Sequence, residues 1–167
     1  MADLVTHICI VLLPGAFLRL RGLPLVVLGA ALPDLAARVP AAVLEAVDRR
    51  IGLPQWLLPG WSVFHEPLPL LALCAALACA FVPGDRRRAL LCLWAGVATH
   101  LALDVLQDHH GRGYMLAFPL NWDLYELGWI GSQATVPIAP WLALATAIAW
   151  AASWLMRVRS RPRSADD

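Results

Sequence analysis

The 167-residue chain contains no lysine and little charge of either sign. Its 13 basic residues are all arginine, its 12 acidic residues nearly balance them, and charged side chains make up only 15% of the sequence. A water-soluble globule of this size needs far more polar surface to cover itself, which excludes a freely soluble enzyme. The net charge of +1 gives no overall attraction to nucleic acid. We therefore expect no direct nucleic-acid partner.

Paired cysteines and an N-terminal export signal are also missing. The four cysteines lie inside apolar runs, and no two of them are spaced as C-x-x-C. Neither a disulfide framework nor a thiolate zinc site is therefore predicted. The first residues carry no basic stretch and no cleavage site. We expect the apolar runs that follow to remain in the mature fold rather than to be removed as a signal peptide.

Apolar side chains are what the chain has in abundance. Hydrophobic residues make up 60% of it, and the mean hydropathy is +0.65. Five apolar segments stand out, at residues 4–18, 23–37, 67–82, 89–106 and 137–156. Only the last two approach the roughly 20 residues that cross a bilayer, so the first three tilt, thin the bilayer or enter it in part. Because the runs lack the alternation of barrel strands, we predict an all-α integral membrane bundle of about five apolar helices.

The arginines predict how these segments are oriented. If all five cross, nine arginines share one side of the membrane: Arg19, Arg21, Arg86, Arg87, Arg88, Arg157, Arg159, Arg161 and Arg163. The other side receives four: Arg38, Arg49, Arg50 and Arg112. Positively charged loops stay in the cytoplasm, so we predict a multi-pass inner (plasma) membrane protein with its N-terminus outside. Residues 1–156 would form the membrane-embedded domain, and residues 157–167 a polar, disordered cytoplasmic tail.

The two outward connections, residues 38–66 and 107–136, are rich in aromatic side chains. These are Trp56, Trp61, Phe64, Tyr114, Phe118, Trp122, Tyr125 and Trp129. Aromatic rings favour the headgroup layer, so we expect aromatic-rich outer loops that lie along the outer membrane interface. Within the first connection, residues 41–51 are predicted to form a short amphipathic helix, with Pro40 at its start and Gly52 at its end.

An ionisable side chain within an apolar helix is costly and marks a functional site by default. The fourth apolar segment contains His100 and Asp104, whose i,i+4 spacing places them on one helical face. Gly96 and Cys92 continue that face in steps of four, and small residues favour close helix contacts. The face is therefore predicted to lie inside the bundle. A hydrogen-bonded pair that holds two helices together is the alternative explanation.

Three more polar residues lie at the outward ends of their segments under this topology: His7, Asp34 and His65. Together with His100 and Asp104 they form a predicted ligand set for a divalent metal ion, with zinc favoured by the imidazoles. Glu66 is the candidate general base and Asp34 a second candidate catalytic group. Taken singly, Asp34 could instead cap a turn after Pro33. The residues that follow the fourth segment, at 108–111, could add ligands or remain solvated.

This pattern resembles the LexA-binding, inner-membrane, metal-dependent hydrolase-like family. The matching elements extend to about residue 119 and are Thr6-His7, the stretch 29–34, His65, the stretch 100–104 and Phe118-Pro119. Ala36 stands where the family pattern commonly has a second aspartate, and the usual histidine signature around the third segment is reduced to Phe64-His65-Glu66-Pro67. The resemblance implies a metal site in an inner-membrane protein and a hydrolytic activity.

Two functions follow from the sequence. The first is a membrane-embedded metal-dependent hydrolase that acts on a lipid ester or phosphodiester, because the aromatic outer loops would hold an amphipathic substrate at headgroup level. The lipid bilayer and a lipid-like substrate are then its expected partners. The second is a non-catalytic membrane scaffold that binds a partner. Ion or proton translocation is disfavoured, because no trail of acidic or histidine residues leads toward the cytoplasmic side.

Overall fold

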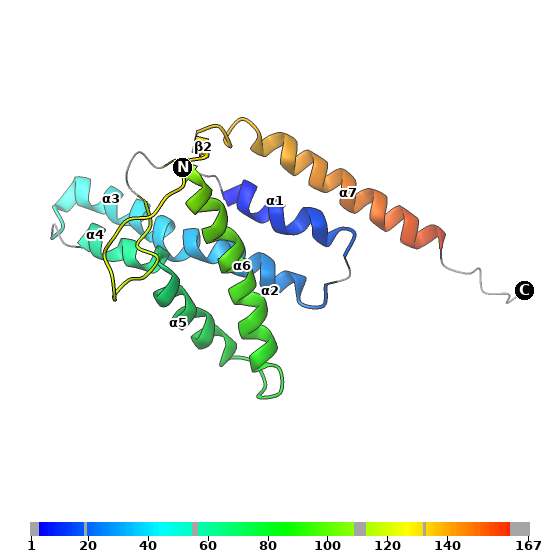
Figure 1. Cartoon of the computed structure of the whole chain (residues 1–167), viewed down its shortest axis with the longest axis horizontal. Coiled ribbons are helices and arrows are strands. Elements are labelled where there is room, and N and C mark those ends of the chain that lie inside the picture. The colour runs from blue at the N-terminus through cyan, green and yellow to red at the C-terminus, as the bar shows by residue number, and fades with distance from the viewer. Residues whose placement is uncertain (1–3, 19, 55–56, 109–112, 132, 161–167) are drawn as a thin grey trace, which may run out of the picture.

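The structure is a computed structural model that describes residues 4–18, 20–54, 57–108, 113–131 and 133–160. It is mainly helical (Figure 1). The apolar segments form α1 (Leu4–Gly15), α2 (Leu23–Pro33), α5 (Pro67–Ala78), α6 (Arg86–Leu106) and α7 (Ala139–Arg159). Shorter elements precede α5: α3 (Val39–Ile51), α4 (Leu57–Ser62) and the 3-10 turn η2 (Val63–His65). Proline lies near the first position of α2, α5 and α7. It suits a helix start because the first backbone N–H groups of a helix make no intrahelical hydrogen bond, so its missing N–H costs nothing there.

The centre of the fold is the crossing of α2 and α6, which allows almost no space between the two backbones. A Cβ atom on Gly96 would lie 2.0 Å from the carbonyl oxygen of Val26, and one on Gly29 would lie 2.0 Å from that of Leu93. Only glycine permits this approach. Leu32, Leu93 and Leu101 continue the contact into an apolar core that α5 completes. The predicted inward orientation of the Gly96 face is thus confirmed.

Helix α2 continues without a break into α3, which corrects the sequence prediction of two separate segments. A π-helical turn, η1 (Asp34–Arg38), joins them into one helix, Leu23–Ile51, of 29 residues. Pro40 lacks an N–H group for the carbonyl of Ala36. That carbonyl instead accepts a hydrogen bond from Trp61 Nε1 at 2.7 Å. The helix therefore passes Pro40 without ending, and α4 is held against the π turn.

Among the described residues, three helices are long and apolar enough to cross a membrane: Leu23–Ile51, Arg86–Leu106 and Ala139–Arg159. Helices α1 and α5 have 12 residues each. At 1.5 Å per residue such a helix is about 18 Å long, well short of a hydrocarbon core of about 30 Å. Both lie beside longer helices in Figure 1, α1 along α7 and α5 along α6.

Helix α7 is attached to the C-terminal end of α1 by hydrogen bonds to backbone carbonyls. Trp150 Nε1 donates to the carbonyl of Leu12, and Ser153 Oγ and Arg157 Nη2 both donate to the carbonyl of Ala16. The carbonyl of Leu12 also accepts a hydrogen bond from Ala16 N, while the carbonyl of Ala16 lies just beyond the end of α1, where intrahelical partners run out. Helix α7 extends to Arg159, three residues into the segment assigned to the tail, while residues 161–167 lie outside the described residues.

The segment between α6 and α7 contains short extended pairings, which modifies the all-α prediction. Strand β1 (Gln107–Asp108) pairs in parallel with β2 (Ile130–Gly131), and Tyr114 and Tyr125 form an antiparallel bridge. Trp122 and Trp129 are exposed, at 67% and 75%, as expected of interface residues. Tyr114 is buried instead, so the aromatic residues of this segment serve more than one purpose.

The Gly96 contact yields a stability prediction. Gly96→Ala would force α2 and α6 apart, and we expect it to lower the free energy of unfolding by more than the ~1–3 kcal/mol typical of overpacking. This would occur although alanine is the better helix former by about 1 kcal/mol. The measurement is the midpoint of thermal unfolding in detergent. Gly84→Ala is the matched control, because a Cβ on Gly84 meets nothing within 4 Å. Equal midpoints for the two variants would contradict the described crossing.

Candidate metal centre

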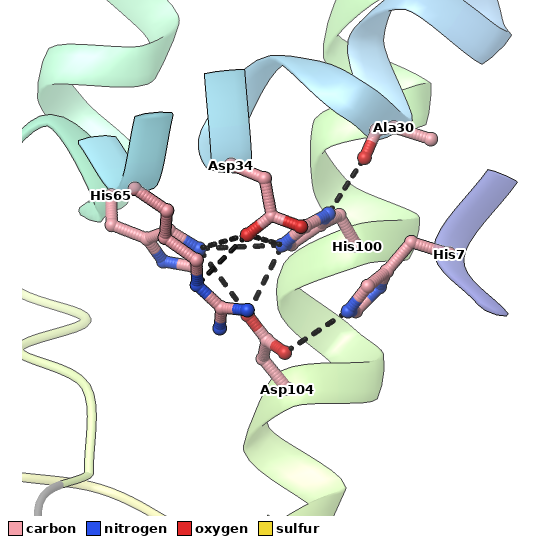
Figure 2. A network of polar contacts seen from close by, with 7 residues as sticks. His7, Ala30, Asp34, His65, His100 and Asp104 are labelled. Carbon is pink, nitrogen blue, oxygen red and sulfur yellow. Dashed lines mark hydrogen bonds and ion pairs between the residues drawn. The ribbon is translucent and has the colours of Figure 1, made fainter. Parts of the chain in front are cut away.

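The five residues of the predicted ligand set lie together in the structure (Figure 2). They come from four elements: His7 from α1, Asp34 from the start of η1, His65 from the end of η2, and His100 and Asp104 from α6. All five side chains are buried, with residue exposures of 6% or less. Residues nearly a hundred positions apart are thus brought to one place by the α2–α6 crossing and the helices that flank it.

Three of the ligand atoms form a compact triangle. His100 Nε2 lies 3.3 Å from His65 Nε2 and 3.2 Å from Asp104 Oδ2, and His65 Nε2 lies 3.5 Å from the same oxygen. In a tetrahedral site with metal–ligand bonds of about 2.0–2.1 Å, neighbouring ligand atoms are about 3.3 Å apart. The triangle therefore has the dimensions of one face of such a site. These buried histidine and aspartate groups could hold a metal ion.

A hydrogen bond to the backbone determines which ring nitrogen of His100 carries the proton in the neutral ring. Its Nδ1 lies 2.6 Å from the carbonyl oxygen of Ala30 in α2. A carbonyl only accepts, so Nδ1 carries the proton and donates it. In the neutral ring Nε2 is then unprotonated and points at the Asp104 carboxylate. Metal-binding histidines typically donate their other ring N–H to a carbonyl or carboxylate in this manner.

Hydrogen bonding alone leaves this cluster poorly satisfied. Neither Asp104 oxygen has a hydrogen-bond partner with good geometry, although imidazole nitrogens lie 3.2–3.5 Å away, whereas Asp34 Oδ1 lies 2.9 Å from Arg38 Nε. A neutral His65 can place a single N–H among these acceptors. Buried acceptors that face one another are costly unless a cation or protons lie between them. The arrangement could therefore accommodate a bound cation at Asp104, while Arg38 already contacts Asp34.

Asp34 and His7 lie at the edge of the triangle. Asp34 Oδ1 is 3.7 Å from His65 Nε2 and 3.9 Å from His100 Nε2, slightly too far for the same tetrahedron without a small movement. His7 Nε2 lies 3.3 Å from the other oxygen of Asp104, Oδ1, and its ring stacks on that of His100 with centroids 3.7 Å apart. With His100, Asp34 and His7 form a second group whose ligand atoms lie within 4.8 Å of one another, so either could also contact a bound ion. The alternative role of Asp34 as a cap is not observed, since the helix continues through it.

Sequence reasoning missed two residues that border the cluster, Arg38 and Tyr114. Arg38 Nε lies 2.9 Å from Asp34 Oδ1, an i,i+4 contact across the π turn. The Tyr114 ring stacks on His65 with centroids 5.3 Å apart. Burial, reinforced by the nearby Asp104 carboxylate, raises the pKa of Tyr114 and keeps its hydroxyl protonated. The Asp34–Arg38 spacing was visible in the sequence, whereas nothing local distinguished Tyr114 from the other loop aromatics.

Burial also sets the protonation of His65. It lowers the pKa of His65, and this outweighs the opposing effect of Asp34 and Asp104. The ring is therefore neutral at pH 7, which is the form that binds a metal ion.

Glu66 directly follows His65 in the sequence and is buried, but it is not part of the polar network of the cluster. Among the described residues, no hydrogen bond or ion pair connects it to the five, and its interaction is with the backbone of Met115. Burial raises the pKa of Glu66, and its Oε2 atom has no hydrogen-bond partner. Its predicted role as a base stays a prediction. Of residues 108–111, only Asp108 is described, in β1, and the others lie outside the described residues.

A pocket of about 220 Å³ opens beside the cluster. Its lining residues come from the π turn, α3, α4, η2 and the segment before α7, namely Ala37, Arg38, Ala41, Ser62, His65 and Tyr114. Since His65 belongs to both, the pocket leads to the candidate metal centre. A small molecule could therefore reach the cluster from this side.

No protein-family model, curated protein or solved structure matches this chain. The protein is therefore characterised by its structure: a helical bundle that, in its described part, has three helices of membrane-spanning length and a buried cluster of histidine and aspartate residues. The resemblance drawn from the sequence motifs stays a prediction.

The geometry predicts that the purified protein carries about one divalent metal ion per chain. Asp104→Asn and His100→Ala remove one corner of the triangle each, and we expect either to lower metal affinity at least about 10-fold. The measurement is elemental analysis of detergent-purified protein after dialysis. Asp123→Asn is the matched control, because Asp123 is exposed and bonds only to Asn121 among the described residues. Metal-free wild-type protein that is nevertheless fully folded would contradict a metal centre.

Proposed function

We propose that the protein is a membrane-embedded metal-dependent hydrolase that uses zinc. His65, His100 and Asp104 would be the primary ligands, with Asp34 as the fourth and His7 holding Asp104. The observation that carries the proposal is the position of His100 Nε2, which lies 3.2 Å from a carboxylate oxygen of Asp104 and 3.3 Å from His65 Nε2 in a buried site. Two or three imidazoles with a carboxylate are a common zinc ligand set.

A zinc ion held in such a site lowers the pKa of a coordinated water to about 7 and polarises a carbonyl or phosphoryl oxygen. The chain's own residues would supply the rest of the chemistry. Asp34 would orient or complete the ligand set, and Glu66 would accept a proton from the attacking water. A carboxylate with a raised pKa suits proton exchange near neutral pH. His7 would keep the second oxygen of Asp104 in place.

The surroundings of the cluster support an amphipathic substrate. A second pocket, of about 270 Å³, is lined by apolar residues of α5, α6 and the segment after Tyr114. Some of these residues lie close in the sequence to residues of the pocket at His65. The lining of the second pocket includes Leu68, Trp94 and Phe118. His65 precedes Leu68 by three residues, and Tyr114 precedes Phe118 by four. Both pockets are lined mainly by apolar groups, and the one at His65 adds the polar groups of Arg38 and Ser62, which would suit an amphipathic substrate such as a lipid ester or phosphodiester.

The proposed location is the inner membrane, with the cluster toward the outer side. His100 lies about 21 Å along α6 from Arg86, and Asp104 about 27 Å, at 1.5 Å per residue. If the arginine-rich end of α6 is cytoplasmic, both residues are in the outer half of a hydrocarbon core of about 30 Å. This agrees with the location that the resemblance to the inner-membrane hydrolase-like family implies.

Hydrolysis should depend on the metal and on Glu66 separately. We expect a chelator to abolish release of p-nitrophenol from p-nitrophenyl esters or phosphodiesters, and zinc to restore it. Glu66→Gln should lower kcat about 100-fold or more with unchanged metal content, because it removes a proton acceptor. Glu45→Gln, on the exposed face of α3, is the control. A folded, metal-free and inactive wild-type protein would instead favour the scaffold function.

A further inference from the structure

The pocket beside the cluster contains one formal positive charge, at Arg38. We infer that this pocket binds the phosphate group of the substrate, so that the enzyme cleaves phosphate esters in preference to uncharged carboxylic esters. The inference rests on the proposed hydrolase function and specifies its substrate class. Arg38, Ser62 and Tyr114 supply polar groups to the lining, while Ala37 and Ala41 are small and leave space for a ligand.

The position of Arg38 follows from the π turn. Asp34 and Arg38 are its first and last residues, and Arg38 Nε contacts Asp34 Oδ1 at 2.9 Å. The same oxygen is 3.7 Å from His65 Nε2. Asp34 therefore connects the guanidinium to the metal ligands and restricts its orientation. A planar guanidinium with several N–H donors matches phosphate oxygens better than a lysine ammonium does.

The charges of the contact network favour an anionic ligand. Asp34 and Asp104 contribute two negative charges and Arg38 one positive charge. A divalent ion would add positive charge to the cluster, and Arg38 places a further cation at the pocket. Buried charge is costly unless it is compensated, so an anionic phosphodiester would be favoured there over an uncharged carboxylic ester.

The reaction is then hydrolysis of a phosphodiester. The water oxygen forms a bond to phosphorus, and the bond between phosphorus and the leaving ester oxygen breaks. One water proton passes to Glu66, which then gives it to the leaving oxygen, so that an alcohol forms and the carboxylate is restored. The products are a phosphate monoester and an alcohol, and no oxidant or further reactant is needed. Arg38 would hold a non-reacting phosphate oxygen throughout.

The first experiment measures binding, independently of turnover. Inorganic phosphate is titrated into zinc-loaded wild-type protein, Arg38→Gln and Arg38→Lys by calorimetry. We expect Arg38→Gln to weaken phosphate binding about 10- to 100-fold, the range for a hydrogen bond to a charged group, with unchanged metal content. Arg38→Lys should retain part of the affinity because it keeps the charge. Arg49→Gln, on the exposed face of α3, is the matched control. Equal phosphate affinity in wild type and Arg38→Gln would overturn the inference.

The second experiment compares substrates. Bis(p-nitrophenyl) phosphate, p-nitrophenyl butyrate and a short-chain phosphatidylcholine are offered to wild type and Arg38→Gln. We expect wild type to cleave the phosphodiesters with the higher kcat/KM and Arg38→Gln to lose about 10- to 100-fold on them alone. Preference for phosphatidylcholine with release of choline or phosphocholine would identify a lipid phosphodiester, and preference for bis(p-nitrophenyl) phosphate a soluble one. Release of fatty acid from phosphatidylcholine would instead be carboxylic ester cleavage and would count against the phosphate inference. Preferred cleavage of the butyrate ester would overturn the phosphate inference while the hydrolase proposal stands, whereas metal-free, inactive wild-type protein would overturn the hydrolase proposal.

Discussion

The hydrogen bond from His100 to the carbonyl of Ala30 is the interaction on which the candidate site depends. It forms only because α2 and α6 approach closely enough for Gly29 and Gly96 to exclude any side chain at the crossing. A larger residue there would separate the helices and release the imidazole. The bond sets the ring's tautomer and directs Nε2 toward Asp104. Helix packing in this protein is therefore directly coupled to the chemistry of the cluster.

The π turn between α2 and α3 is the second structural requirement. A regular helix that ended before Pro40, as proline commonly causes, would leave Arg38 in a connection. The extended turn instead keeps Asp34 and Arg38 within one helix and in contact. π-Helical turns inside α-helices are often found at functional sites. The indole of Trp61 stabilises this one by binding the carbonyl that Pro40 leaves without a partner.

Buried polar residues are costly in any apolar protein, and the cost explains why these five lie together. Separately, each of His7, Asp34, His65, His100 and Asp104 would have to find its own partner among apolar side chains. Collected in one cluster, their side chains contact one another and could hold a metal ion. The segment after α6 adds Tyr114 over His65 and keeps its backbone paired with Tyr125, so the cluster is covered without being sealed. The pocket at Arg38 remains as an entry.

The periodicity and polarity of the sequence were enough to identify the apolar helices. They also identified the face of α6 that carries His100 and Asp104, because a helix of fixed pitch brings residues four apart to one side. They also identified Gly96 as a close-packing position. Tertiary structure decided the rest. Whether Pro40 ends a helix depends on Trp61 being nearby, and whether Tyr114 is buried depends on the pairing of a loop with itself. The relation of Asp34 to Arg38 and to both histidines depends on the π turn. The contacts of Trp61 with Ala36 and of Asp34 with both histidines join residues at least 25 positions apart, and no local pattern encodes them, whereas the Asp34–Arg38 pair is only four residues apart.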